Sequence, residues 1–227
     1  MPVHTRREGP LGWIVLDRPE KAHAYDRGQL EAIDEAVRTL ADAAVVIVES
    51  TGERAFCAGA DLDAMKGAAP LDALELLSQR VFTRLARTPA VTIAAVQGAA
   101  IAGGFELALA CDLRVAGPRA RFELPETRLG ILPSAGGTTR LARLVGPARA
   151  KAVILGGEVV DAPTALTWGL VSRIAEAPSE AAAAWARTIA ARDPGALRLA
   201  KETLDVDEST AALSRERTIE AILYSRR

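Results

Sequence analysis

Three short apolar runs constrain the fold of this chain most strongly. They are LGWIVL at Leu11–Leu16, AVVIVE at Ala44–Glu49 and VTIAAV at Val91–Val96. Successive side chains of a strand point to opposite faces of its sheet, so a continuous apolar run predicts a strand that is covered on both faces. The runs therefore predict the buried strands of a sheet.

Helical spacing of apolar residues lies between and after these runs. It extends from Asp26, a candidate N-cap, to about Ala41, and again over Leu71–Leu85. Phe105–Ala110 reads as a buried helix, and from Thr138 onward the chain is mostly helix, broken at glycines and prolines. Strands that alternate with helices, followed by helices alone, predict an α/β layer fold with a helical C-terminal third.

Three further segments are shorter and harder to interpret. Leu113–Ala116 predicts a short strand, whereas Gly98–Gly104 reads as a turn of small residues and Pro125–Gly137 as a loop. The polar, basic Met1–Pro10 lacks the apolar core of a signal peptide, and no run of 18 apolar residues occurs. We therefore expect neither a secretory leader nor a membrane span.

Composition narrows the class of protein. With 227 residues, 49% of them hydrophobic, the chain can form one sizeable domain with a small helical appendage. A net charge of -1 gives no general attraction to nucleic acid or to an anionic membrane. Cys57 and Cys111 show neither metal-ligand spacing nor a CxxC motif, which predicts reduced thiols in a cytoplasmic protein.

Two segments share one design, in which a buried strand leads through small residues into the start of a helix. They are Phe56–Leu62 (FCAGADL) and Gly98–Leu107 (GAAIAGGFEL). Small residues admit a ligand close to the backbone, and free amides at a helix start favour negative charge. Two such amides aimed at one point would stabilise a developing enolate oxygen. Either segment alone also fits an ordinary turn, and neither matches a nucleotide phosphate motif.

Two glutamates stand in apolar settings near these segments. Glu106 lies within GGFELALA, and Glu126 lies within FELPETRLGILP. Desolvation of a carboxyl group raises its pKa and suits it to proton transfer near neutral pH. Each alone also fits a surface residue or an ion-pair member, but together they suggest one site with acid and base steps.

Taken in order, these motifs make the chain resemble the crotonase superfamily, the enoyl-CoA hydratases and isomerases. The resemblance covers roughly residues 10 to 205. The matching stretches are LDRPEKAHA at Leu16–Ala24, AFCAGADL at Ala55–Leu62, GGFELA at Gly103–Ala108 with Cys111-Asp112, FELPE at Phe122–Glu126, LGILP at Leu129–Pro133, Gly136–Leu141 and Ala162–Val171.

The resemblance implies a crotonase-like spiral of repeated ββα units at residues 1–175. A C-terminal helical trimerisation region at residues 176–227, apparently truncated, would complete a homotrimer or a dimer of trimers. It also implies a role in fatty acid metabolism. Members of the family need no metal or redox cofactor, because coenzyme A is part of the acyl-CoA substrate.

The same resemblance assigns the site residues. It places the oxyanion hole at the amides of Ala60 and Gly103, and makes Glu106 and Glu126 the catalytic pair that activates water and exchanges the α proton. The implied CoA-binding residues are Lys21, Ala22, Ala24, Ala58, Asp61 and Leu62. The predicted reaction is hydration of a 2-enoyl-CoA.

Three features depart from the family pattern. His23 stands where Asn is usual, and Ser134 follows Pro133 where Gly is common. His23 fits either a tolerated polar exchange in a turn or a catalytic group. Ser134 fits a hydrogen-bond partner of Glu126 or of water, or a residue that only fills a turn. The chain also stops at Arg227, before a further helical segment that would close over acyl-CoA and pack on a neighbour.

Other readings remain open. A double-bond isomerase of the same family needs one well-placed carboxylate and tolerates an apolar residue at position 106. A retro-Claisen or dehalogenating hydrolase, or a serine protease on the same fold, would need a His or Asp that this site lacks. A non-catalytic acyl-CoA-binding subunit is the alternative that the short C-terminus favours.

Overall fold

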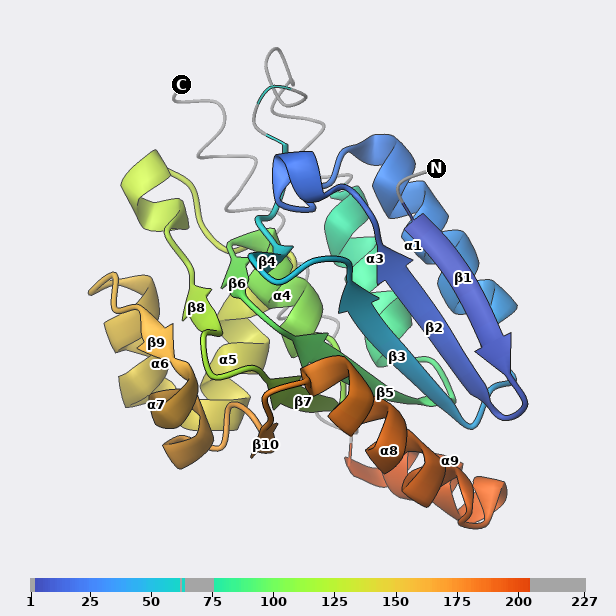
Figure 1. Cartoon of the computed structure of the whole chain (residues 1–227). Coiled ribbons are helices and arrows are strands. Elements are labelled where there is room, and N and C mark those ends of the chain that lie inside the picture. Colours follow the sequence, from blue (N-terminus) through green and yellow to red (C-terminus); the bar gives the residue numbers. More distant parts are fainter. Residues whose placement is uncertain (1–2, 62, 64–75, 205–227) are drawn as a thin grey trace.

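The computed structural model describes residues 3–61, 63 and 76–204. Within this part of the chain, a six-stranded sheet has the order β1-β2-β3-β5-β7-β10 and a four-stranded sheet has the order β4-β6-β8-β9 (Figure 1). The strands of the larger sheet are β1 (Val3–Glu8), β2 (Leu11–Leu16), β3 (Val45–Ser50), β5 (Val91–Val96), β7 (Leu113–Ala116) and β10 (Arg173–Ile174).

Both faces of the larger sheet are covered, as the apolar runs predicted. On one face, Trp13 and Ile47 pack in a cluster with Ala186 of helix α8 (Pro178–Ala190). On the other face, Ile14 and Val46 join the main core with helices α1 (Arg27–Thr39) and α3 (Leu77–Ala86). Figure 1 shows α8, with α9 (Pro194–Leu204), on the side of the sheet opposite to α1 and α3.

Helix α1 shows how the sequence fixes an element locally. The Asp26 carboxylate accepts a hydrogen bond from the Gln29 amide, and the Gln29 side chain accepts one from the Asp26 amide. This reciprocal capping box starts the helix where the sequence predicted its N-cap. Leu30, Ile33 and Val37 then bury one face of the helix against the sheet.

The smaller sheet consists of short strands. They are β4 (Ala55–Cys57), β6 (Ala99–Ile101), β8 (Arg121–Glu123) and β9 (Val160–Asp161). Three times, a strand of the larger sheet leads into one of these: β3 into β4, β5 into β6, and β7 into β8. Helix α4 (Gly103–Leu109) follows β6, and the 3-10 turn η2 (Glu126–Leu129) follows β8.

This progression confirms the predicted crotonase-like spiral of ββα units. The repeat lies in the structure although the sequence shows no internal repeat. The remaining helices, α5 (Gly137–Val145), α6 (Pro147–Ile154) and α7 (Ala162–Thr167), lie beside the smaller sheet (Figure 1).

Several sequence predictions need correction. The polar start of the chain forms β1, which pairs antiparallel with β2. The supposed small-residue turn before Gly103 contains β6, and the supposed loop after Pro125 contains η2. The helical C-terminal third also contains β9 and β10, each of two residues. All these elements are too short or too polar to show an apolar period.

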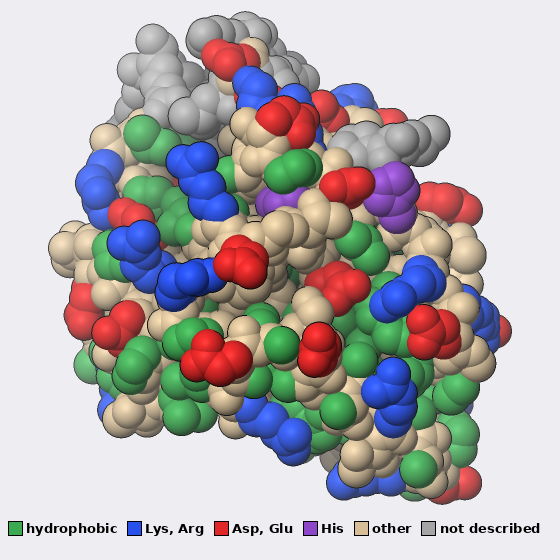
Figure 2. Space-filling view, viewed as in Figure 1, with side chains coloured by type: hydrophobic (Ala, Val, Ile, Leu, Met, Phe, Trp, Pro, Cys, Tyr) green, Lys and Arg blue, Asp and Glu red, His purple; other side chains and the backbone are tan. Residues whose placement is uncertain are grey.

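Of the helix predicted over Leu71–Leu85, the part from Leu77 is observed as α3; Leu76 precedes it with a non-helical backbone, and residues 71–75 lie outside the described part. The division at residue 175 falls between β10 and α8 and stays a prediction, as does everything expected for residues 205–227. Among the described residues, no helix is long and apolar enough to cross a bilayer. On the face shown in Figure 2, acidic and basic side chains are interspersed.

Candidate active site

Three neighbouring parallel strands of the smaller sheet end at the same edge. Strand β6 pairs in parallel with both β4 and β8. The chain that leaves β4 carries Ala60, the chain that leaves β6 carries Gly103 and Glu106, and the chain that leaves β8 carries Glu126. The carboxyl ends of parallel strands meet at one edge, so this topology gathers the four predicted residues from distant parts of the sequence.

Ala60 is held from both sides by the backbone of Tyr25. The Tyr25 amide donates to the Gly59 carbonyl at 2.8 Å, and the Asp61 amide donates to the Tyr25 carbonyl at 2.8 Å. In this parallel bridge the Ala60 amide is turned away from Tyr25. Among the described residues, no backbone partner accepts a hydrogen bond from the Ala60 amide, which leaves it available to a ligand.

Gly103 is the first residue of α4, so its amide has no acceptor within the helix. The preceding Ala102 has φ 52° and ψ -129°, a conformation that L-residues rarely adopt. This conformation lets the chain turn sharply out of β6 into the helix. No backbone hydrogen bond between described residues uses the Gly103 amide.

Glycines bring the two candidate oxyanion segments into backbone contact. A Cβ on Gly59 would lie 3.1 Å from the Gly103 nitrogen, and a Cβ on Gly104 would lie 1.9 Å from the Cys57 carbonyl oxygen. Only residues without a Cβ allow this approach. The segment Cys57–Ala60 therefore rests directly on the start of α4.

Glu106 is buried, with 3% of its surface exposed, and lies in the first turn of α4. Its Oε1 atom accepts hydrogen bonds of 2.8 Å from the amides of Ala135 and Gly137. Two amide donors on one oxygen favour the ionised carboxylate. The segment before α5 therefore holds Glu106 in a form that can accept a proton.

Glu126 begins η2 directly after Pro125 and is buried, with 5% of its surface exposed. Its backbone carbonyl accepts from the amides of Gly130 and Ile131, which closes the turn beneath it. The burial expected for both glutamates is thus confirmed. Each of the two carboxyl groups, when ionised, raises the pKa of Tyr25, so both lie in the neighbourhood of its hydroxyl.

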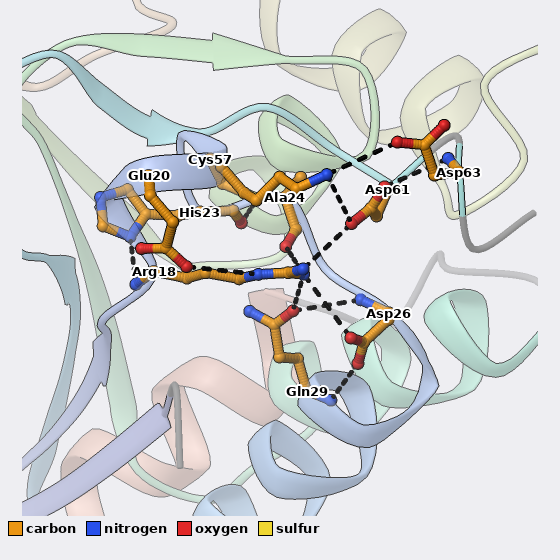
Figure 3. Close-up of polar contacts among 10 residues, drawn as sticks. Arg18, Glu20, His23, Ala24, Asp26, Gln29, Cys57, Asp61 and Asp63 are labelled. Carbon is orange, nitrogen blue, oxygen red and sulfur yellow. Dashed lines mark hydrogen bonds and ion pairs between the residues drawn. The ribbon is translucent and has the colours of Figure 1, made fainter.

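The predicted CoA-binding backbone is folded into a compact turn beside this site (Figure 3). Ala22 has φ 50°, and its carbonyl accepts from the Ala58 amide at 3.0 Å. The Ala24 carbonyl accepts from the Arg18 guanidinium at 3.2 Å. The exposed Lys21 ammonium lies 3.8 Å from Asp61 and 3.5 Å from Asp63. Four of the predicted residues, Lys21, Ala22, Ala24 and Ala58, are thereby brought together.

The enoyl-CoA hydratase/isomerase family model matches residues 6–226 of this chain. The chain belongs to the enoyl-CoA hydratase/isomerase family. A model that spans nearly the whole chain includes all three strand ends that carry the candidate residues.

Individual members of the family resemble this chain over most of its length. The short-chain-enoyl-CoA hydratase of Clostridium acetobutylicum is 36% identical over 89% of this chain and 80% of its own length. The crotonyl-CoA hydratase of Syntrophomonas wolfei is 37% identical over 77% of this chain and 69% of its own. The structure of an enoyl-CoA hydratase from Bacillus anthracis superposes with a TM-score of 0.87 at 32% identity, covering 99% and 90% of the two chains.

In this member of the family, the Asp61 carboxylate is bound by other residues of the same chain. Its Oδ2 lies 3.1 Å from the Arg18 guanidinium, and its Oδ1 accepts from the Asp63 amide at 3.1 Å. Arg18 also donates to Gln29 Oε1 at 3.0 Å, which ties α1 to the segment after β4 (Figure 3). The observed contacts of Asp61 thus fix the loop that carries Ala60, while its predicted neighbour Leu62 lies outside the described residues.

The ring of His23 forms structural hydrogen bonds at the same turn. Its Nδ1 accepts the Arg18 amide at 3.1 Å, and its Nε2 lies 2.9 Å from the Thr51 carbonyl, which assigns the proton to Nε2. Burial lowers the pKa of His23, although Asp17 and Glu20 act in the opposite direction. The neutral ring therefore links two backbone segments, in agreement with a polar exchange in a turn.

Ser134 also contributes through its backbone. Its carbonyl accepts a hydrogen bond of 2.7 Å from Gln79 of α3, while the neighbouring Ala135 amide donates to Glu106. Ser134 therefore lies in the loop that orients Glu106. The predicted contact of its side chain with Glu126 is not among the observed hydrogen bonds of the described residues.

The sequence analysis missed Tyr25, which is buried between the candidate oxyanion segments and α3. A Cβ on Gly103 would lie only 1.9 Å from its hydroxyl oxygen. Tyr25 directly follows the stretch Leu16–Ala24 and lies between Ala24, a predicted CoA-binding residue, and Asp26, a predicted helix cap. An aromatic hydroxyl directly after a predicted binding turn was the signal that could have identified it.

Proposed function

We propose that this chain catalyses the addition of water across the 2,3 double bond of an enoyl-CoA thioester. One observation carries the proposal: two buried glutamates and two available amides follow three adjacent strand ends. The names of the similar proteins, among them a short-chain-enoyl-CoA hydratase and a crotonyl-CoA hydratase, support the same reaction.

In the proposed mechanism, the thioester oxygen accepts hydrogen bonds from the amides of Ala60 and Gly103. Water attacks the β carbon while Glu106, ionised and held by two amides, takes a proton from it. The electrons of the double bond form an enolate, whose negative oxygen the amides stabilise. Glu126 starts protonated and delivers its proton to the α carbon, which gives the 3-hydroxyacyl-CoA.

The proposal requires no further reactant. Water adds without net oxidation or reduction, so no redox cofactor enters the balance, and the enolate charge is assigned to the two amides rather than to a metal. We propose that the turn at Ala22, Ala24 and Ala58 receives the adenine and that Lys21, the exposed cation beside it, contacts the CoA phosphates. The Asp61 carboxylate would bind CoA only indirectly, by holding this turn and Lys21 in place.

The decisive experiment follows the loss of enoyl absorbance when the purified protein meets crotonyl-CoA, and then longer and cyclic enoyl-CoAs. General acid–base groups contribute about 10²–10⁴ in rate, so Glu106→Gln and Glu126→Gln should each lower kcat by that factor. Glu53→Gln is the matched control, because Glu53 is exposed and, among the described residues, pairs with the exposed Arg119 alone. Unchanged turnover in both site variants would refute the assignment.

Two other outcomes would select the alternatives. Migration of a 3,4 double bond that needs Glu126 but not Glu106 would indicate an isomerase. Tight thioester binding without turnover of any enoyl-CoA would indicate a non-catalytic subunit. Having a buried glutamate at both positions favours the hydratase over either.

The oligomeric state, the cellular compartment and the metabolic role of the protein are also proposals. We propose a homotrimer, or a dimer of trimers, that acts in cytoplasmic fatty acid metabolism, as the family resemblance implies. Sedimentation velocity of the full chain measures the assembly directly. A monomer at micromolar concentration would contradict it.

A further inference from the structure

Tyr25 contacts both halves of the proposed oxyanion hole. Its amide and carbonyl hold the residues on either side of Ala60, through two hydrogen bonds of 2.8 Å. A Cβ on residue 103 would lie 1.9 Å from the Tyr25 hydroxyl oxygen and 2.8 Å from its Cζ, which is too close for either contact. One residue thus bridges the segment after β4 and the start of α4.

The ring of Tyr25 is fixed on its other side by α3. The ring of Phe82 meets the Tyr25 ring nearly at right angles, with centroids 5.8 Å apart, and the Ser78 side chain lies close enough to the hydroxyl to lower its pKa. Edge-to-face contact of this kind is a favourable aromatic geometry. The hydroxyl therefore has a defined position, set by a helix that belongs to neither oxyanion segment.

We infer that Tyr25 is a positioning residue for the enolate-forming step, which sets the spacing of the Ala60 and Gly103 amides. This inference rests on the proposed hydration and adds a residue to it. The hydroxyl fills the space beside the Gly103 Cα, so the start of α4 cannot move toward α3. The backbone bridge fixes Ala60 at the same time, and together these contacts set the separation of the two amides.

The electrostatic setting keeps the hydroxyl neutral. Burial raises the pKa of Tyr25 well above its usual range, and the negative charge of Glu106 raises it further. A protonated hydroxyl adds no negative charge beside an enolate. The chain thus places a polar but uncharged group against the oxyanion segments, where a carboxylate would oppose the reaction.

The test compares Tyr25→Phe and Tyr25→Leu with the parent protein. Both variants keep the backbone bridge to Ala60, but Phe leaves a hydroxyl-sized gap beside Gly103 and Leu leaves a larger one. Small misplacement of a reacting group costs up to about 10² in rate, so we expect kcat to fall about tenfold for Phe and further for Leu. KM for crotonyl-CoA should change less than about threefold, because ground-state binding uses the CoA moiety.

A spectroscopic measurement separates positioning from general stability. The infrared stretching frequency of a bound thioester carbonyl reports the hydrogen bonds that polarise it. In the parent protein with bound 3-hydroxybutyryl-CoA, this frequency should lie below its value in water, and in Tyr25→Phe it should move back toward that value. Thr188→Val, which removes an exposed hydroxyl of α8 that donates to the Ala184 carbonyl, should leave both readouts unchanged.

The outcomes distinguish the two proposals. A parent protein that hydrates no enoyl-CoA refutes the proposed function, while the bound carbonyl frequency still tests Tyr25. A parent that hydrates crotonyl-CoA, with Tyr25→Phe equal to it in both kcat and carbonyl frequency, overturns the positioning role. A fall in kcat with an unshifted carbonyl also overturns it, because the hydroxyl would then act on a step other than oxyanion binding.

Discussion

The two sheets of this protein differ in what they contribute. The larger sheet has strands of up to six residues, buried by apolar clusters on both faces, and none of the candidate catalytic or oxyanion residues lies in it. The smaller sheet has strands of two or three residues, and the chain leaving three of them carries Ala60, Gly103, Glu106 and Glu126. The larger sheet therefore contributes mainly to stability, whereas the smaller sheet positions the candidate site residues.

The smaller sheet also buries apolar side chains, among them Phe56 and Phe122. The positions of its site residues depend in addition on close contacts between backbone segments. The segments after β4 and β6 approach each other at Gly59 and Gly104, where a Cβ would meet backbone atoms. In the larger sheet, side chains fill the space between layers, and their loss leaves a cavity. Substitutions in the two sheets should therefore have opposite signatures.

Among substitutions that compare the two sheets, Gly104→Ala should have the largest effect on activity. The new Cβ would lie 1.9 Å from the Cys57 carbonyl oxygen, so the segment that carries Ala60 must move away from α4. Separation of the two amides removes one donor from the enolate oxygen, which costs about 10²–10³ in rate. The measurement is kcat for crotonyl-CoA hydration, with the fold checked by circular dichroism.

Gly28→Ala is the matched control for that variant. Gly28 lies in α1, and a Cβ there would meet only the Asp26 side chain, at an ordinary 3.5 Å. We expect unchanged kcat and a free energy of unfolding raised by about 0.4–1 kcal/mol. Equal kcat in Gly104→Ala and Gly28→Ala would show that the close approach at Cys57 is irrelevant to turnover.

Ile93→Ala should give the opposite signature. Ile93 is fully buried in β5, beneath α8, and truncation of such a side chain costs about 2–5 kcal/mol of unfolding free energy. The folded fraction should retain kcat within about threefold, because no candidate catalytic group touches this cluster. Urea unfolding measures the loss of stability, and kcat is measured on the same preparation. A loss of kcat as large as that of Gly104→Ala would show that the two sheets do not differ in this way.

The smallest effect concerns His23, whose ring links the backbone of Arg18, after β2, to that of Thr51, after β3. Burial holds its pKa below the ordinary 6.5, so the unfolded chain takes up a proton first as the pH falls. Stability is therefore full above pH 6.5 and is lost as the pH falls from 6.5 toward the folded pKa, at up to about 1.4 kcal/mol per pH unit.

The measurement is the free energy of unfolding of the parent and His23→Asn between pH 5 and 8. The parent should lose stability more steeply with acid than the variant. His4 is exposed, bonds only Asp17 and is present in both proteins, so its contribution cancels. Parallel profiles would mean that His23 titrates alike in the folded and unfolded chains.

The same contrast explains what the sequence could predict. Leu11–Leu16 and Val91–Val96 were predicted at their observed bounds, because burial on both faces leaves an uninterrupted apolar run. The strand Ala99–Ile101 replaces the predicted turn, because two alanines and one isoleucine among glycines are too short a run to show a strand period. Its formation depends on neighbours from β4 and β8, which no local pattern contains.

The candidate site divides in the same way. Glu106 and Glu126 stood out through apolar neighbours and the family resemblance, and their burial agrees with that reading. The contacts that hold Glu106 are distant in sequence, because the amides that bind it lie 29 and 31 residues further along the chain. The position of Tyr25 beside Gly103 joins residues 78 positions apart, so only the folded chain discloses it.

If the smaller sheet aims two amides at one oxygen, a crystal structure of the full chain with bound 3-hydroxybutyryl-CoA will show both contacts. We predict the thioester oxygen at about 2.7–3.1 Å from the nitrogens of both Ala60 and Gly103, with the 3-hydroxyl between Glu106 and Glu126. A thioester oxygen that contacts neither amide, in a complex where the acyl group lies away from both glutamates, would contradict the account.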